Sequence, residues 1–248
     1  MNGLKTAKDR IIFPLDFSSL NDAKKYIRHL SPHVGMFKIG LELFIRCGPE
    51  IIGFISSLNR TAVFLDLKLH DIPETVYRSV SGIAELNVRF TTVHCGESMK
   101  SLEAAVRGSR GKVGILGVTV LTSVSEKDLA RSGYADSFCT DIPKLVIKKA
   151  EMAKDAGCAG VVCSGNEVKS IKEKFGEGFI TITPGIRPIW DETRGDDQVR
   201  IVTPEEAIQN GADYLVIGRP IRDASDPPAA AKRVADEIEL MLQERQSR

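Results

Sequence analysis

The chain has 248 residues, of which 27% are charged, with 34 lysines and arginines against 33 aspartates and glutamates. This balance gives no general attraction to nucleic acid or to an anionic membrane surface, and no apolar run approaches the ~18 residues needed to cross a bilayer. The five cysteines are scattered and contain no Cys-x-x-Cys pair, which argues against a disulfide or zinc framework. The first ten residues are polar and lack the apolar stretch of a signal peptide, so we expect a cytoplasmic protein without nucleic-acid or membrane partners.

Short runs of apolar and β-branched residues alternate with longer helical patterns along the whole chain. Eight runs predict strands that are buried on both faces, as in a parallel sheet: Arg10–Leu15, Met36–Ile39, Ala62–Leu67, Phe90–His94, Val113–Val120, Gly160–Cys163, Phe179–Thr183 and Tyr214–Ile217. Eight further segments predict helices: Leu20–Leu30, Glu50–Leu58, Glu74–Leu86, Ser98–Gly108, Ile142–Ala156, Val168–Phe175, Pro204–Asn210 and Pro228–Leu242. Gly157 and Gly211 follow two of these helices, where a left-handed residue commonly ends a helix.

This alternation predicts an α/β chain, and its length, near the ~250 residues typical of the fold, favours a closed (β/α)8 TIM barrel. A doubly wound open sheet is the alternative, but it requires a glycine-rich turn after the first strand, and residues 14–18 do not form one. No repeat, low-complexity stretch or linker divides the chain, so we expect one domain over residues 1–248. Two stretches have no clear element, Ser123–Asp141 and the longer Pro184–Thr203, which has the length of a functional loop.

The stretch from Asp66 to Thr75 contains the strongest sign of a functional site. Asp66 and Lys68 stand two residues apart at the end of an apolar run, so on a strand their side chains point to the same face. Buried charges are costly unless they are paired, and we therefore interpret this pair as part of a site. The alternative is a structural ion pair at the end of a strand, with Asp71 helping to begin the helix that Pro73 and Glu74 predict.

Polar residues follow most of the predicted strands, at the end of a (β/α)8 barrel where the active site lies. In chain order they are Asp16, Lys38, Asp66 with Lys68, His94, Thr122, Ser164, Arg187 and Arg219. Gly218 and Arg219 open the last loop, in which barrels commonly hold phosphate, because glycine lets backbone N–H groups approach an anion and arginine adds a bidentate donor. A Gly-Arg pair elsewhere is more often a turn with a solvated arginine, so this prediction depends on its place in the barrel.

The charged residues at these strand ends do not have the pattern of a metal site. Only four histidines occur in the chain, and we interpret His94 as a histidine of the core or pocket wall. Asp16 and Asp66 carry the oxygens that Mg²⁺ prefers, but Lys38 and Lys68 would stand in the same pocket and oppose a cation. Two acids and two bases therefore predict a charge network without a metal. Trp190, in the longer loop, is interpreted as a packing anchor.

Seven short motifs occur in order between about residues 10 and 222: Leu15-Asp16, Lys38-Ile-Gly40, Asp66-x-Lys68-x-x-Asp71-Ile-Pro-x-Thr75, Val120-Leu-Thr-Ser123, Pro184-Gly-Ile-Arg-Pro188, Gly195-Asp-Asp-Gln198 and Ile217-Gly-Arg-Pro220. Each is weak alone, but the ordered set resembles the bacterial orotidine 5′-phosphate decarboxylase family. That resemblance implies a (β/α)8 barrel and a homodimer with shared active sites. It also implies conversion of orotidine 5′-monophosphate to UMP and CO₂, the last step of de novo pyrimidine nucleotide synthesis, without a metal or an organic cofactor.

The resemblance also implies roles for individual residues. Lys68 resembles the family's catalytic lysine, which protonates C6 as CO₂ leaves, and Asp66 and Asp71 resemble the carboxylates of an alternating charge array that includes Lys38. Flanking carboxylates favour the ammonium form of Lys68, which can then stabilise a developing carbanion. Asp71 and Thr75 match residues that reach into the partner subunit's site. The other matches are substrate-binding positions: Asp16 and Lys38 for the ribose, Thr122, and Arg187, Gln198, Gly218 and Arg219 around the phosphate. The segment Ile189–Arg194 departs most from the family pattern.

Two alternative functions remain open from the sequence. Mg²⁺-dependent sugar-phosphate lyases and decarboxylases of the same superfamily resemble the chain at Asp16 and at the Asp-x-Lys-x-x-Asp motif. They hold the metal partly through a glutamate where this chain has Lys38, and a protonated lysine cannot ligate Mg²⁺. The other alternative is a catalytically inactive barrel that only binds nucleotides, against which the intact Asp66, Lys68 and Asp71 argue.

Overall fold

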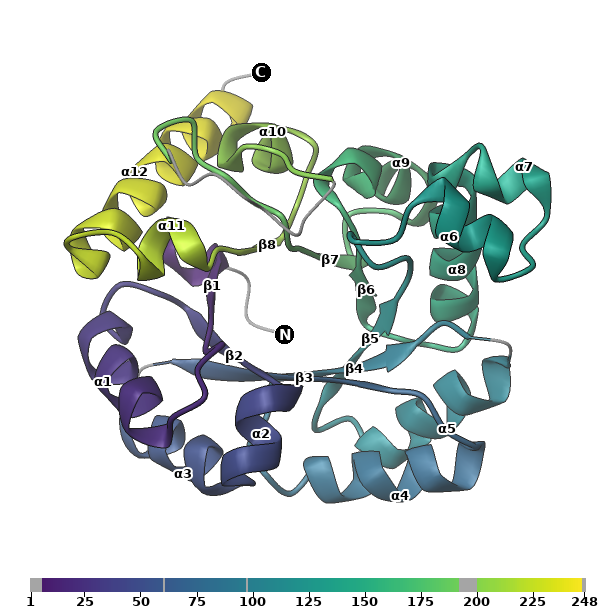
Figure 1. Cartoon of the computed structure of the whole chain (residues 1–248), viewed down its shortest axis with the longest axis horizontal. Helices are drawn as coiled ribbons and strands as arrows, with labels where there is room; N and C mark the ends of the chain where they lie inside the picture. Colours follow the sequence, from purple (N-terminus) through teal and green to yellow (C-terminus); the bar gives the residue numbers. More distant parts are fainter. Residues whose placement is uncertain (1–5, 60, 97, 192–199, 247–248) are drawn as a thin grey trace.

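The computed structural model describes residues 6–59, 61–96, 98–191 and 200–246. Eight parallel strands pair in chain order and close into a barrel, because β8 also pairs with β1 (Figure 1). The strands are β1 (Ile11–Pro14), β2 (Met36–Gly40), β3 (Ala62–Leu69), β4 (Phe90–His94), β5 (Gly114–Val118), β6 (Gly160–Val162), β7 (Ile180–Thr183) and β8 (Tyr214–Val216). The predicted (β/α)8 barrel and each of its predicted strands are confirmed.

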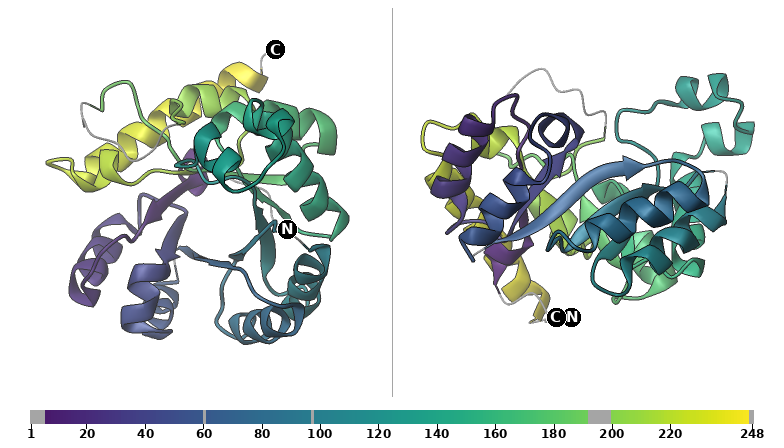
Figure 2. Two further views of the ribbon diagram at one scale, coloured as in Figure 1. Left: turned by 45° about the vertical axis from the view of Figure 1, so that its right-hand side comes forward. Right: turned by 90° about the horizontal axis from the view of Figure 1, so that it is seen from below.

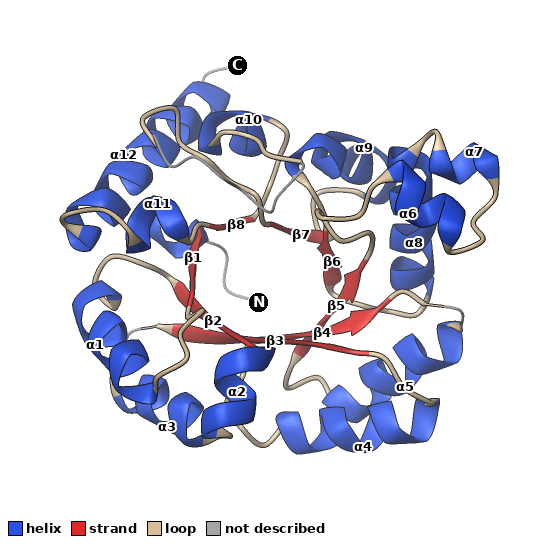
Figure 3. Cartoon of the chain, viewed as in Figure 1, coloured by secondary structure: helices blue, strands red, loops and turns tan. Residues whose placement is uncertain are grey.

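Helices form a layer around the strands (Figure 3). The helices that match predicted segments are α1 (Leu20–Leu30), α3 (Glu50–Ser57), α4 (Pro73–Ile83), α5 (Met99–Ser109), α8 (Ile142–Asp155), α9 (Gly165–Phe175), α10 (Pro204–Gln209) and α12 (Pro227–Gln246). Gly157 and Gly211, which follow α8 and α10, have φ of 83° and 98°, as their predicted places after helix ends require. Across the described ranges, every helix is too short or too polar to cross a membrane.

Five short helical segments were not predicted from the sequence. They are the 3₁₀ segment η1 (Ala7–Arg10), α2 (Leu41–Cys47), α6 (Glu126–Arg131), α7 (Asp136–Cys139) and α11 (Arg219–Arg222). The stretch after Ser123, expected to be irregular, thus contains α6 and α7, and this teal segment protrudes beyond the rest of the helical layer (Figure 2). A capping box between Ser125 and Asp128 begins α6. At six residues, α6 is too short to develop a readable apolar period.

The core consists of two clusters, one on each side of the strands. Ile12 belongs to a small cluster that fills the barrel interior with Phe64, Phe90 and Tyr214, whereas its neighbours Ile11 and Phe13 belong to the large cluster between strands and helices. Successive residues of a strand face opposite sides, so burial of both faces explains why the strands read as continuous apolar runs.

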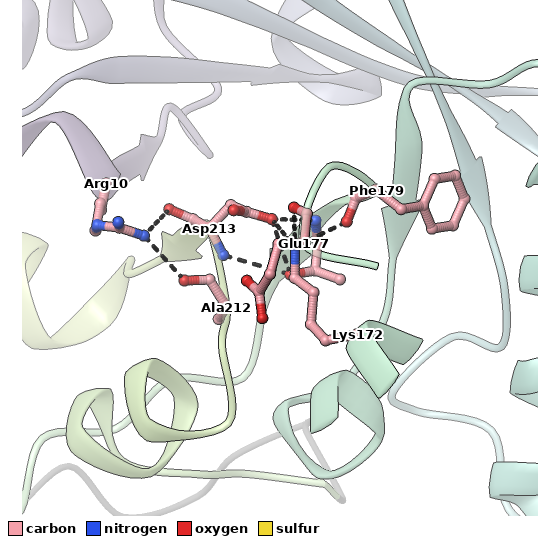
Figure 4. Close-up of polar contacts among 7 residues, drawn as sticks. Arg10, Lys172, Glu177, Phe179, Ala212 and Asp213 are labelled. Atoms are coloured by element: carbon pink, nitrogen blue, oxygen red, sulfur yellow. Dashed lines mark hydrogen bonds and ion pairs between the residues drawn. The ribbon is translucent and has the colours of Figure 1, made fainter. Parts of the chain in front are cut away.

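A buried ion pair fixes the amino ends of β7 and β8. Lys172 of α9 places Nζ 2.7 Å from Asp213 Oδ2, immediately before β8, and also donates to the carbonyl oxygens of Glu177 and Phe179 before β7 (Figure 4). The Lys172 side chain is only 4% exposed, so its charge depends on these partners. Arg10 of η1 donates to the carbonyl oxygen of Asp213 (Figure 4), which adds the first strand to the same junction.

Replacing Lys172 with methionine should therefore lower the free energy of unfolding by roughly 3 kcal/mol, because the Asp213 carboxylate, only 21% exposed, loses its charged partner. The matched control is Lys174→Met on the same helix, since the pair between Lys174 and Glu151 is partly exposed, at 45% and 35% for the two side chains. That control should cost less than about 1 kcal/mol. Denaturant titration of both variants measures the difference, and equal losses would contradict a special role for the buried pair.

Candidate active site

Strand β3 departs from regular pairing shortly before its end. Leu65 lies opposite Thr91 of β4 and Leu69 lies opposite Val93, so three residues of β3 span the distance of one residue of β4. Within this bulge, Lys68 has φ of 49°, in the left-handed region that residues other than glycine rarely adopt. Strained backbone of this kind is concentrated at functional sites, and the bulge thus marks Lys68 independently of its charge.

Thr92 of β4 holds this bulge in place. Its hydroxyl donates to Asp66 Oδ1 at 2.9 Å and accepts the backbone N–H of Lys68 at 2.8 Å. Thr92 is fully buried, so water does not compete for either bond. One hydroxyl therefore orients both the Asp66 carboxylate and the Lys68 backbone. Thr92 was missed in the sequence analysis because a threonine inside a buried β-branched run gives no separate signal.

Four charged side chains form an alternating row at the carboxyl ends of β1, β2 and β3. Asp66 Oδ2 lies 2.6 Å from Lys68 Nζ and 3.9 Å from Lys38 Nζ. Lys38 in turn donates to Asp16 Oδ1 at 3.1 Å. The predicted network among these four residues is thus present, and the place between the carboxylates of Asp16 and Asp66 is taken by the Lys38 ammonium. The middle of the row is buried, with the Asp66 side chain 9% exposed, and its Asp16 end is the most exposed, at 56%.

A cavity of about 620 Å³ opens beside this row at the carboxyl end of the barrel. Its apolar wall comes from side chains of four strands: Phe64, Val118, Val162 and Val216. Its polar lining contains eight of the predicted site residues: Asp16, Lys38, Asp66, Lys68, Thr122, Arg187, Gly218 and Arg219. The barrel therefore brings together residues that are up to about two hundred positions apart in the sequence. Ser123, Cys163 and Arg222 also line the cavity and were not predicted.

The loops after β7 and β8 bring arginines to the cavity. Arg219 and Arg222 are the first and last residues of α11, and Arg187 follows β7. Asp223 pairs with Arg222 through two hydrogen bonds of 2.6 and 2.9 Å, which raise the pKa of the Arg222 guanidinium. At Gly218 an added Cβ would lie 2.9 Å from Pro14 Cγ, so the close approach to β1 requires glycine there.

Two predicted site residues, Asp71 and Thr75, do not line this cavity and are exposed. Asp71 lies instead in a separate hollow of about 340 Å³ with His70 and His94, whose ring centroids are 5.6 Å apart. Burial, and secondarily the charge of His70, lowers the pKa of His94, which agrees with its interpretation as a pocket-wall histidine. Gln198 lies outside the described residues.

Trp190 anchors the loop after β7 to the last helix, as predicted. Its indole Nε1–H donates to Glu237 of α12, and the Arg233 guanidinium lies over the ring at 4.6 Å from the centroid. The neighbouring Ile189 is 83% exposed, so Trp190 alone of the two packs inward. The segment Ile189–Arg194, which departs from the family pattern, is described here only as far as Asp191.

Comparison with known proteins gives a consistent result. The orotidine 5′-phosphate decarboxylase / HUMPS family matches residues 9–234. The orotidine 5′-phosphate decarboxylase of Desulfosudis oleivorans is 50% identical over 98% of this chain and 100% of the relative, and that of Syntrophus aciditrophicus is 44% identical over 94% of each. The crystal structure of orotidine 5′-phosphate decarboxylase from Lactobacillus acidophilus superposes with a TM-score of 0.79 at 34% identity, covering 92% of this chain and 98% of that one. The chain therefore belongs to the orotidine 5′-phosphate decarboxylase / HUMPS family.

Proposed function

We infer that this protein is a carboxy-lyase that converts orotidine 5′-monophosphate to UMP and CO₂ in pyrimidine nucleotide synthesis. The observation that carries this proposal is the row Asp16–Lys38–Asp66–Lys68, which lines the cavity at the carboxyl end of the barrel. The names of the curated relatives support the choice of substrate. The reactants are small polar molecules, and we place the reaction in the cytoplasm.

Lys68 is proposed as the proton donor. When the bond between C6 and the carboxylate breaks, its electron pair stays on C6 and CO₂ departs. The Lys68 ammonium stabilises this developing charge and gives its proton to C6, which leaves a neutral amine that solvent reprotonates. The side chain is 31% exposed, so water can reach it between turnovers. Thr92 fixes the Lys68 backbone and Asp66 holds the amine in position before the reaction begins, as electrostatic preorganisation requires.

Asp66 is proposed to act both on Lys68 and on the substrate. Its carboxylate lies 2.6 Å from the Lys68 amine and is held by Thr92, so it cannot turn away from an approaching anion. A substrate carboxylate placed close enough to Lys68 for protonation at C6 would be repelled by Asp66, whereas neutral CO₂ would not. This repulsion would disappear as the bond breaks, which lowers the barrier.

The remaining cavity residues are proposed to bind the rest of the nucleotide. Asp16 accepts from the ribose hydroxyls and Lys38 donates to them. Thr122 contacts the substrate from the loop after β5. The phosphate lies between the loops after β7 and β8, where Arg187, Gln198, Gly218 and Arg219 bind it. Charge-assisted bonds from arginine suit this dianion.

An absorbance assay for loss of orotidine 5′-monophosphate tests the function, run on enzyme dialysed against a chelator and on undialysed enzyme. Chelation should leave kcat/KM unchanged, because Lys38 Nζ occupies the place between the carboxylates. Activity that vanished on dialysis and returned only with Mg²⁺ would contradict this expectation and favour a sugar-phosphate enzyme. No turnover in either sample would favour a barrel that only binds nucleotides.

Replacing Lys68 with alanine should lower kcat by at least about a thousandfold, since both a proton and a transition-state charge are lost. Single-turnover kinetics measure this step. UMP should still bind within about tenfold of wild type, because it carries no group at C6 for the amine to act on. The control is Lys24→Ala, which breaks a surface pair with Glu50. Turnover of Lys68→Ala within tenfold of wild type would remove the residue from this role.

We also propose a homodimer in which Asp71 and Thr75 complete the partner subunit's site. Both lie outside the cavity of their own subunit. Asp71 and Ile72 immediately precede α4, and Thr75 lies in its first turn; Ile72 is 66% exposed there, and Ile45 of α2 is 78% exposed. Exposed apolar side chains of this size favour burial against another protein surface. A second copy of the chain would cover them and bring Asp71 toward Lys68.

Subunit exchange tests whether Asp71 acts on the partner's site. Inactive Lys68→Ala is mixed with inactive Asp71→Ala, so that one site of each mixed dimer lacks both groups and the other has both. Random mixing makes half of the dimers mixed, each with one good site of two, so roughly a quarter of wild-type activity should return. Mass spectrometry must demonstrate exchange. Exchange without recovery would mean that Asp71 acts within its own subunit.

A further inference from the structure

Arg200 connects three loops at the carboxyl end of the barrel. Its Nη1 donates to Glu167 Oε1 in the first turn of α9, which follows β6. Its Nη2 donates to the carbonyl oxygens of Val120 and Leu121, at 3.0 and 3.2 Å, in the loop after β5. Arg200 itself belongs to the connection that leads from β7 to α10. The contacts are well shielded, because the side chains of Arg200 and Glu167 are 13% and 1% exposed.

The backbone next to Arg200 is held equally closely. Val202 donates its N–H to the carbonyl oxygen of Gly185 at 3.1 Å and accepts the N–H of Arg187 at 2.9 Å. Its side chain packs on the start of α9, where a Cβ added to Gly165 would lie 2.3 Å from Val202 Cγ2. The segment from Arg200 to Val202 is thus a fixed strut between the loops after β5 and β7.

Both ends of this strut reach residues of the substrate cavity. Val120, Leu121, Thr122 and Ser123 line it from the β5 side, and Gly185 and Arg187 line it from the β7 side, whereas Arg200 and Glu167 do not. We propose that Arg200, with Glu167 as its buried counter-ion, is a positioning residue that sets the distance between these two loops and so holds Thr122 and Arg187 where the substrate needs them. The proposal rests on the function inferred above.

Stability alone does not account for this pair. Burying two charges is costly, and apolar side chains of similar volume often stabilise a protein as well or better. Glu167 Oε2 and Arg200 Nε are buried without a hydrogen-bond partner among the described residues, and burial raises the pKa of Glu167. What only a guanidinium supplies is a planar fork that donates to a carboxylate and to two carbonyl oxygens at once. The arrangement is therefore better suited to fixing the relative position of the loops than to stabilising the fold.

Two variants separate positioning from stability. Arg200→Met alone leaves the buried Glu167 without its counter-ion, so both the melting temperature and kcat/KM should fall. Adding Glu167→Leu removes the unpaired charge and should return the melting temperature close to the wild-type value. The loops remain untied, so kcat/KM should stay about tenfold or more below wild type, and the Kd of UMP should rise by a similar factor. Recovery of both stability and kcat/KM in the double variant would overturn the proposal.

The control is Lys172→Met, which weakens the opposite end of the barrel and touches neither loop. Even where it lowers the melting temperature as much as Arg200→Met does, Lys172→Met should leave kcat/KM within about twofold of wild type. A loss of kcat/KM in Lys172→Met equal to that in Arg200→Met would also overturn the proposal.

Hydrogen exchange gives a readout that does not depend on catalysis. The amides of residues 120–123 and 185–187 should exchange faster in the double variant, and unchanged rates would mean that Arg200 does not hold these loops. If the wild-type protein had no decarboxylase activity, the proposed function would be wrong. The hydrogen-exchange rates alone would then show whether Arg200 holds the two loops.

Discussion

The site depends on the hydrogen bonds and ion pairs that hold the Asp66 carboxylate. It is an almost fully buried anion, and such a group is tolerated only when donors surround it. Three strands provide them: Lys38 from β2, Lys68 from β3 itself and Thr92 from β4. The register of these strands is therefore a chemical requirement, because a slip of one residue would turn a donor away and leave the charge unpaired.

The two ends of the barrel have different roles. At the amino ends of β7 and β8, Lys172 and Asp213 join helix, strands and loop through bonds that remain inside the protein. At the carboxyl ends, the charges of Lys38, Lys68 and Arg219 face a cavity. Because the eight described strands close into a barrel, none of them has a free edge. Loops and charges at the carboxyl end can therefore be arranged for a ligand while the amino end stabilises the barrel, as is general for this fold.

The sequence predicted what depends on local pattern or on a place at a strand end, and missed residues whose roles depend on individual hydrogen-bond partners elsewhere in the chain. The strands were readable because both faces are buried, and Asp66 and Lys68 because charges interrupt an apolar run. The shared direction of these two side chains was inferred from regular strand geometry, whereas the structure reaches it through a bulge with Lys68 in a left-handed conformation. Thr92 and Arg200 gave no signal, since their roles depend on partners on other strands and loops, up to about eighty residues away.

The left-handed backbone at Lys68 has a consequence for how this protein can evolve. A non-glycine residue in that conformation costs roughly 1–2 kcal/mol, and glycine would adopt it without that cost. Backbone strain therefore opposes the lysine at this position, whereas its ion pair with the buried Asp66 favours it. Selection for thermal resistance without selection for turnover would therefore be expected to replace Lys68 and Asp66 together, because replacing the lysine alone leaves the buried carboxylate with one donor fewer.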